Sequence, residues 1–125
     1  MNILVLDDEK IVGDRIKASV EKKGHSLETY VDPIAALGRI REKRFDVVIL
    51  DIRMDGMDGI QVLDAVTTRD PDTRVIMITG YATLEIARET LTKGAFDFIA
   101  KPFKLGEIHQ AIERAKEDIM ARVAG

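Results

Sequence analysis

The sequence predicts an α/β fold, (βα)5, in which five helices cover a doubly wound, five-stranded parallel sheet. Short runs rich in β-branched residues alternate along the chain with longer stretches of helical period, which is typical of βαβ units. Two of these runs are apolar throughout, as expected of strands covered on both faces. Right-handed crossovers leave few arrangements, and five strands favour the flavodoxin-like order 2-1-3-4-5.

The expected strands coincide with the apolar runs. The first, third and fourth runs are expected at the centre of the sheet because they are the most apolar. The second run contains Glu28 and Thr29 and is expected at an edge. In chain order the five runs cover residues 2–6, 27–31, 46–50, 74–79 and 95–100.

Five helices are expected between and after these runs: at about residues 10–23, from Pro33 through Ile40, at about 59–68 and 84–93, and from Leu105 through Ile119. Gly24 and Gly94 are expected to end the helices that precede them, and Asp32 with Pro33 is expected to begin the second helix. The side chains expected to face the sheet recur every three or four residues. They are Val12, Ile16 and Val20; Ile34, Leu37 and Ile40; Val62, Leu63 and Val66; Leu84, Ala87 and Leu91; and Leu105, Ile108, Ile112, Ala115 and Ile119.

Size and composition narrow the class of protein. With 125 residues the chain is expected to form one domain, residues 1–125. Cysteine is absent, which excludes disulfides and thiolate metal sites and suits a reducing, cytoplasmic location. A net charge of −3 gives the domain no net electrostatic attraction to nucleic acid. No apolar run approaches the ~20 residues needed to cross a bilayer. We therefore expect neither nucleic acid nor membrane as a direct partner.

Side chains suited to chemistry follow four of the expected strands. Asp7 and Asp8 follow the first, Asp51 the third, Thr79 the fourth and Lys101 the fifth. In open parallel sheets the ligand crevice lies beyond the carboxyl ends of the strands. These four strands are neighbours in the expected order. Three carboxylates, a hydroxyl and an ammonium should therefore share one pocket.

Crowded carboxylates either share protons or bind a cation, because like charges a few ångströms apart cannot all stay ionised unaided. Oxygen ligands without nearby Cys or His favour a hard ion, and Mg²⁺ suits a site with few protein ligands. Asp8 and Asp51 are the expected direct ligands, and Asp7 is expected to act partly through water. Mn²⁺ is expected to substitute.

A divalent cation, a lysine and a hydroxyl together suit a phosphoryl group, which an aspartate could accept covalently. Asp51 is the best-placed nucleophile because it ends the most buried strand. Singly, each residue has an ordinary interpretation as a helix cap, a loop hydroxyl or a surface charge. The combination at adjacent strand ends is what favours an aspartyl phosphate.

The sequence resembles, over essentially its whole length, the receiver domain of two-component response regulators, of which the chemotaxis regulator is one. The matching segments agree in order and spacing. They are ILVLDDE at 3–9, DVVILDIRMDGMDG at 46–59, VIMITGYA at 75–82 and FDFIAKPF at 96–103.

The resemblance implies a role for each residue of the pocket. Asp51 matches the phosphoacceptor, and Lys101 the lysine of the family pattern. Asp7 and Asp8 match the acidic pair, and the backbone carbonyl of Arg53 would complete the Mg²⁺ shell. Family receivers take the phosphoryl group from a phosphohistidine on a sensor histidine kinase or phosphotransfer protein. They catalyse only their own phosphorylation and dephosphorylation, so no enzyme activity on other substrates is expected.

The resemblance also implies how the signal leaves the pocket. Thr79 matches the switch hydroxyl and Phe98 the aromatic switch position, which could alternatively be a plain core residue. The face built from the fourth helix, fifth strand and fifth helix would change shape and bind an output domain, a partner protein or a second copy of the chain. Arg53 and Tyr81 occupy variable positions, where large side chains would shield the acyl phosphate from water or simply line the rim.

Three alternatives stay open. An unphosphorylated receiver-like scaffold would usually lack the acceptor or the lysine. A Mg²⁺-dependent hydrolase with an aspartyl intermediate would want Asp-x-Asp after the first strand, whereas Asp7 and Asp8 are adjacent. A flavodoxin-like electron carrier would want a Ser/Thr-rich phosphate loop there. Whether the domain stands alone or belongs to a longer regulator, which kinase serves it and which output it controls are not decided.

Overall fold

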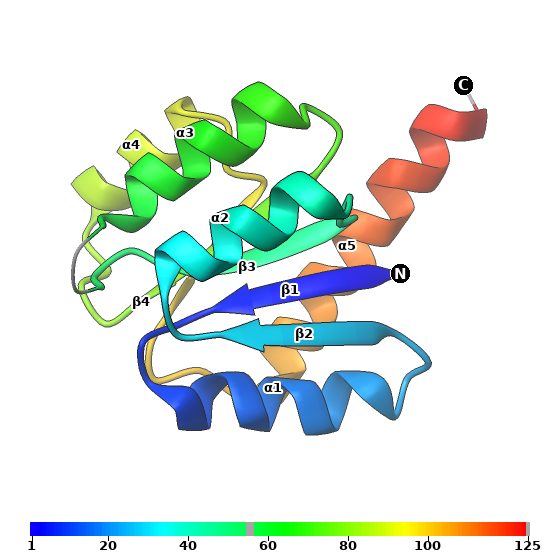
Figure 1. Ribbon diagram of the computed structural model, residues 1–125, viewed down its shortest axis with the longest axis horizontal. Helices are drawn as coiled ribbons and strands as arrows, with labels where there is room; N and C mark the ends of the chain where they lie inside the picture. Colours follow the sequence, from blue (N-terminus) through cyan, green and yellow to red (C-terminus); the bar gives the residue numbers. More distant parts are fainter. Residues whose placement is uncertain (55–56, 125) are drawn as a thin grey trace.

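The computed structural model describes residues 1–54 and 57–124; residues 55 and 56, within the 46–59 segment, and residue 125 lie outside the described residues. Five strands and five helices alternate along the chain (Figure 1). They are β1 Asn2–Leu6, α1 Lys10–Glu21, β2 Ser26–Tyr30, α2 Pro33–Glu42, β3 Val47–Asp51, α3 Gly59–Arg69, β4 Arg74–Thr79, α4 Leu84–Thr92, β5 Asp97–Ala100 and α5 Leu105–Ala124.

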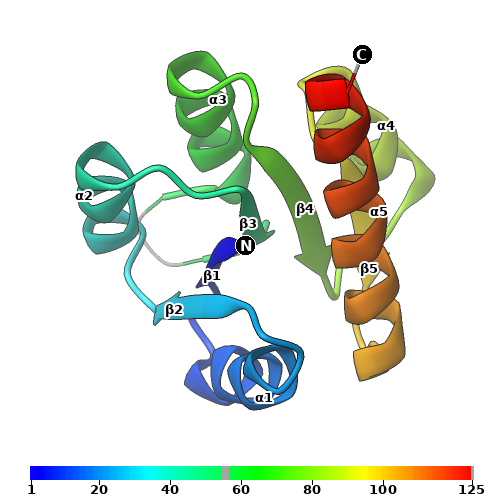
Figure 2. The ribbon, with the colours of Figure 1, turned by 90° about the vertical axis from the view of Figure 1, so that its right-hand side faces the viewer.

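The strands form one parallel sheet in the order β2-β1-β3-β4-β5, which confirms the expected class and topology. Helices cover both faces (Figure 2). Alternate strand residues point to opposite faces, so Ile3 and Ile49 pack in a core beneath α1 and α5, and Leu4 and Leu50 in a second core beneath α2 and α3. The central strands are buried throughout, which explains their continuous apolar runs.

The parallel register brings the carboxyl ends of the strands to one edge. Leu6 of β1 pairs with Leu50 of β3, so the next residues, Asp7 and Asp51, lie side by side at the ends of neighbouring strands. Thr79 of β4 pairs with Ala100 of β5, directly before Lys101. Every residue expected in the pocket therefore lies at this edge, at the last position of a strand or in the loop that follows it.

One expected inward residue of α2 is wrong, whereas Ile40 is buried and Leu37 is partly buried against the core, as expected. In α2, Ile34 is 64% exposed, and the inward positions are Pro33, Ala36 and Ile40. Ile34 follows Pro33 in the first turn, and its side chain points away from the face that the later turns bury. The expected bounds of β2, β3, β5, α1, α2, α3 and α4 also shift by one or two residues, as is common at element ends, and α5 continues five residues beyond Ile119, to Ala124.

In α4 the expected inward stripe is rotated. Leu84 and Leu91 are 67% and 48% exposed, whereas Thr90 is fully buried and Ile86 packs against the core. The Thr90 hydroxyl donates to the carbonyl of Ala87 at 3.0 Å, so a polar side chain is buried without an unsatisfied donor. Apolar spacing alone could not show this.

None of the helices in the described part of the chain combines the length and apolar character needed to span a bilayer.

One ion-pair network ties β2 to α2. Glu28 accepts from Arg39 through Nε at 2.9 Å and Nη2 at 3.2 Å, from Lys43 Nζ at 3.3 Å and from the Tyr30 hydroxyl at 2.9 Å. Chiefly through the hydrogen bonds from Arg39, this network lowers the pKa of Glu28 to about 2. The ionised carboxylate is therefore favoured in the folded protein.

Glu28→Gln should lower the free energy of unfolding by about 1–2 kcal/mol at neutral pH, since charge-assisted hydrogen bonds to a partly exposed group are lost. A depressed carboxyl pKa stabilises the fold above the ordinary value of 4.5, and that stability is lost as pH falls toward 2. Urea unfolding between pH 3 and 7 should show the difference from the native chain shrinking with acid. Glu117→Gln, on the exposed side of α5, is the control. A difference independent of pH would contradict this account.

Candidate functional site

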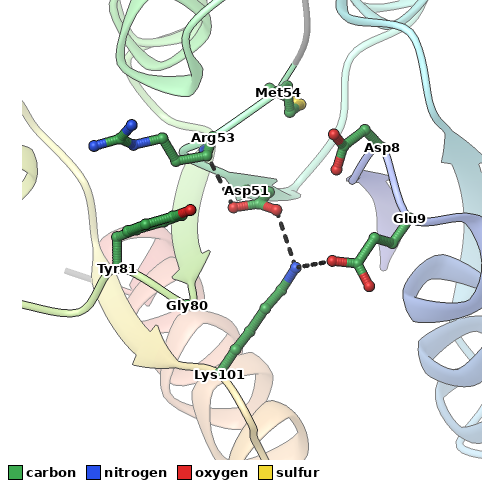
Figure 3. Close-up of a pocket in the computed structure, with 8 residues that line it drawn as sticks. All are labelled: Asp8, Glu9, Asp51, Arg53, Met54, Gly80, Tyr81 and Lys101. Atoms are coloured by element: carbon green, nitrogen blue, oxygen red, sulfur yellow. Dashed lines mark hydrogen bonds and ion pairs between the residues drawn. The ribbon is translucent and has the colours of Figure 1, made fainter.

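A cavity of about 430 Å³ opens at the carboxyl edge of the sheet (Figure 3). Loops after β1, β3, β4 and β5 build it, as expected for a parallel sheet of this order. Its lining residues are Asp8, Glu9, Asp51, Arg53, Met54, Gly80, Tyr81 and Lys101.

Three carboxylates meet at this edge. Asp7, Asp8 and Asp51 each offer an oxygen, and these oxygens lie within 4.8 Å of one another. Asp7 and Asp51 are buried, and Asp8 is exposed. The structure thus brings together all three acids that the sequence places at the ends of the first and third strands.

The Lys101 ammonium lies between these acids. Its Nζ is 2.7 Å from Asp7 Oδ2 and 3.0 Å from Asp51 Oδ2. Burial lowers the pKa of Lys101, but the close interactions of the ammonium with both aspartates outweigh burial and leave the pKa raised. The lysine is held at the sheet edge by its backbone N–H, which donates to the Thr79 carbonyl at 2.8 Å, and its peptide bond to Pro102 is cis.

Asp7 is the most constrained acid. Its Oδ1 accepts from the Glu9 N–H at 2.9 Å. Its Oδ2, although close to Lys101, lacks hydrogen-bond geometry and is the one buried side-chain oxygen without a hydrogen-bond partner among residues 1–54 and 57–124. Burial raises the pKa of Asp7, against the lowering effects of Lys101 and the Glu9 N–H. An additional cation would offset the free-energy cost of keeping the buried Asp7 carboxylate ionised.

The donor set fits a hard divalent cation. Its ligand atoms are carboxylate oxygens, one of them buried and lacking a hydrogen-bond partner. Negative charge also exceeds positive charge: Asp7, Asp8, Glu9 and Asp51 surround a single inward-pointing ammonium. The acidic cluster could therefore hold a metal ion.

Thr79 and Phe98 lie outside the cavity lining. Thr79 is fully buried at the end of β4, and its hydroxyl oxygen accepts from the Tyr81 N–H at 3.0 Å. Phe98 is half-buried in β5 beside Met77 and packs against the core beneath α2 and α3. Both are close in sequence to residues that line the cavity, Gly80 and Lys101, but do not line it themselves.

Arg53 and Tyr81 form a stacked pair at the rim. The Arg53 guanidinium carbon lies 4.4 Å from the centre of the Tyr81 ring, a cation–π contact. Figure 3 shows the guanidinium directed away from Asp51, while the Arg53 N–H donates to Asp51 Oδ1 at 3.3 Å. Both residues were expected at the pocket, but their stacking was not.

Gly59 fixes the start of α3 against the end of β3. Its N–H donates to the Ile52 carbonyl at 2.8 Å, and Asp58 and Gln61 form a capping box at the same helix end. A Cβ on Gly59 would lie 2.2 Å from the Asp51 carbonyl oxygen and 2.7 Å from Ile52 Cα. Only glycine permits this approach. The glycine-containing segment after the third strand was the available sequence signal.

Known proteins agree with this arrangement. The family model described as response regulator receiver domain matches residues 3–113. The nitrogen assimilation regulatory protein NtrX of Azorhizobium caulinodans is 34% identical over 123 residues, which cover 97% of this chain and 27% of that protein. Sporulation initiation phosphotransferase F of Bacillus subtilis is 32% identical over 112 residues, 90% of each chain.

Among solved structures, the beryllofluoride-activated dimer of the NtrC4 receiver domain superposes with a TM-score of 0.90 at 32% identity, covering 94% of this chain and 98% of that one. This chain spans about a quarter of the NtrX relative's length. The chain therefore belongs to the response regulator receiver domain family, whose members act in two-component signalling and are phosphorylated on an aspartate.

Proposed function

We propose that this receiver domain accepts a phosphoryl group on Asp51 from the phosphohistidine of a sensor histidine kinase or a phosphotransfer protein. An Asp51 carboxylate oxygen attacks phosphorus and forms the acyl phosphate bond. The phosphorus–nitrogen bond breaks, and the imidazole keeps its electron pair and takes a proton from solvent. The observation that carries this proposal is the Asp51 carboxylate, which lines the cavity and is held between the Arg53 N–H and Lys101.

Some of the surrounding residues would bind the metal ion, and others would contact the phosphoryl oxygens directly. Asp8, Asp51 and the Arg53 backbone carbonyl would hold Mg²⁺ directly, and Asp7 would do so through water; Mn²⁺ would substitute. When bound, the ion supplies positive charge close to the phosphoryl oxygens. Lys101 pairs with one of those oxygens, and Thr79 donates to another. The domain acts only on its own acyl phosphate, and we infer a cytoplasmic location.

The switch runs from Thr79 to Phe98. In the present structure the Thr79 hydroxyl accepts from Tyr81. Turning toward a phosphoryl oxygen would release that contact and open space for the half-buried Phe98 to move inward. An inward phenyl ring leaves no hydroxyl unsatisfied. If Phe98 resonances respond to a phosphoryl donor equally in the native chain and in Asp51→Asn, this coupling is wrong.

The α4-β5-α5 face would read out the change. Leu84 and Leu91 of α4 are exposed there and offer apolar contact area for an output domain, a partner protein or a second copy of this chain. The NtrC4 receiver, which is similar to this chain, was solved as an activated dimer. That likeness supports a homodimer as one form of the output.

Phosphorylation itself is tested by incubating the protein with Mg²⁺ and acetyl phosphate, followed by intact-mass measurement. The native chain should gain one phosphoryl group, and neither Asp51→Asn nor a sample with excess chelator should. Asp64→Asn, a change in α3 outside the cavity lining, is the matched control and should be modified normally. No adduct on the native chain would favour an unphosphorylated scaffold instead.

The Arg53–Tyr81 stack should slow hydrolysis of the acyl phosphate because it covers one side of the cavity. Arg53→Asn combined with Tyr81→Glu removes the stack. The phosphoryl half-life should fall by about tenfold, which is about 1.4 kcal/mol in the barrier. Decay of the mass adduct after donor removal measures it, with Arg88→Asn on exposed α4 as control. An unchanged half-life in the double variant would show that both residues are plain rim residues.

A further inference from the structure

Glu9 occupies a helix-capping position that it does not use for capping. It is the N-cap of α1 with an extended backbone, φ −87° and ψ 102°, yet its side chain makes no capping hydrogen bond. Glutamate is not among the side chains preferred there. The Glu9 N–H is fixed by Asp7 Oδ1, and its carboxylate is directed into the cavity toward Lys101 (Figure 3).

Lys101 has three carboxylate neighbours, which differ in their distance from the ammonium and in their exposure. Asp7 and Asp51 lie at 2.7 and 3.0 Å and are buried, whereas Glu9 Oε1 lies at 3.9 Å and its side chain is 65% exposed. An ion pair of that length with one exposed partner contributes little to stability. It is therefore the contact that Lys101 gives up most easily, and the one through which its position can be adjusted without unfolding the site.

The Glu9–Lys101 contact also lies between two cavities. Both residues line the phosphorylation cavity and a second cavity of about 380 Å³, whose lining includes Val12, Pro102 and Phe103. The Lys101 side chain thus passes along a shared wall, with Glu9 on the α1 side and Asp51 on the β3 side. Movement of the ammonium toward one acid is movement away from the other.

We propose that Glu9 is a positioning residue that retains the Lys101 ammonium on the α1 side of the pocket and so competes with an incoming phosphoryl group for it. The proposal rests on phosphorylation of Asp51. Loss of the Glu9 contact leaves Lys101 free to follow the phosphoryl oxygens, so the transfer becomes faster. The cost of the contact is small because its Glu9 side is exposed, and the benefit is an unphosphorylated state with a defined lysine position.

Two substitutions separate positioning from simple charge. Glu9→Gln removes the charge and the contact, whereas Glu9→Asp keeps the charge but shortens the reach by one methylene. Both should raise the initial rate of phosphorylation by acetyl phosphate about two- to fivefold at low ionic strength, the size expected for a weak ion pair with one exposed partner. Glu117→Gln, on α5, should match the native rate. A native rate in Glu9→Asp with a faster Glu9→Gln would mean that only pocket charge matters and would overturn the proposal, as would native rates in both.

A second measurement reads Lys101 directly. The NMR signal of its ammonium in the unphosphorylated protein should shift in Glu9→Gln and in Glu9→Asp but stay in place in Glu117→Gln. Thermal unfolding close to that of the native chain confirms that the variants fold. If the native chain is never phosphorylated on Asp51, the proposed function fails, and the Lys101 signal alone decides this inference. An unmoved signal in both Glu9 variants overturns it.

Discussion

Gly59→Ala should lower the free energy of unfolding by about 3 kcal/mol or more, the upper end of what overpacking costs. The new methyl would lie 2.2 Å from the Asp51 carbonyl oxygen, and its neighbour is backbone that cannot rotate away. Either α3 must move off the sheet or β3 must shift at its last residue. Asp51 is this last residue of β3, so the variant should also be phosphorylated more slowly. Urea unfolding and the acetyl phosphate assay measure the two effects.

Gly38→Ala is the matched control for this substitution. Gly38 lies within α2, and a Cβ there would meet nothing within 4 Å. Alanine should therefore leave stability unchanged or raise it by up to about 1 kcal/mol through its better helix propensity. Equal stability of Gly59→Ala and Gly38→Ala would contradict the close approach of α3 to the end of β3.

Lys101→Met should destabilise the metal-free protein by about 3 kcal/mol, because two buried carboxylates lose the cation that they share. The loss should be partly reversed by saturating Mg²⁺, which binds the folded acids and not the unfolded chain. Phosphorylation of Asp51 should also become slow. The free energy of unfolding with chelator and with Mg²⁺ measures the first two effects, and the acetyl phosphate assay the third.

Lys104→Met tests whether any nearby lysine would have the same influence. Lys104 is exposed, and its side chain does not line the cavity. Its loss should change neither stability nor the Mg²⁺ response by more than about 0.5 kcal/mol. A Lys101→Met protein as stable as the native chain in chelator would show that Asp7 and Asp51 do not depend on the ammonium.

Much of this fold could be predicted because its strands are buried on both faces. The short, β-branched Val-Val-Ile-Leu run of β3 is typical of a strand buried on both faces. The residues that end such parallel strands then lie at one edge, which brings Asp7, Asp51 and Lys101 together. Helix faces were harder. Apolar spacing in α4 fits Leu84 and Leu91 as well as it fits Ile86, and Thr90 is buried through a hydrogen bond within its own turn. Spacing carries no information about such a bond.

Within the site, the predicted residues are those that strand ends position, and the unpredicted features depend on loop paths and rotamers. Arg53 stacks on Tyr81 because of the direction in which two loops leave the sheet. Glu9 faces Lys101 because its backbone is held by Asp7 and its side chain is released from capping. Neither could follow from residue type and order alone.

Reductive trapping of the acyl phosphate tests most directly whether Asp51 is the acceptor. The protein is exposed to acetyl phosphate and Mg²⁺ and then treated with sodium borohydride, which reduces an aspartyl phosphate to homoserine. Peptide mapping by mass spectrometry should find homoserine at position 51 and unmodified aspartate at positions 7 and 8. Homoserine at Asp7 or Asp8, or an intact-mass adduct without reduction at Asp51, would contradict the assignment.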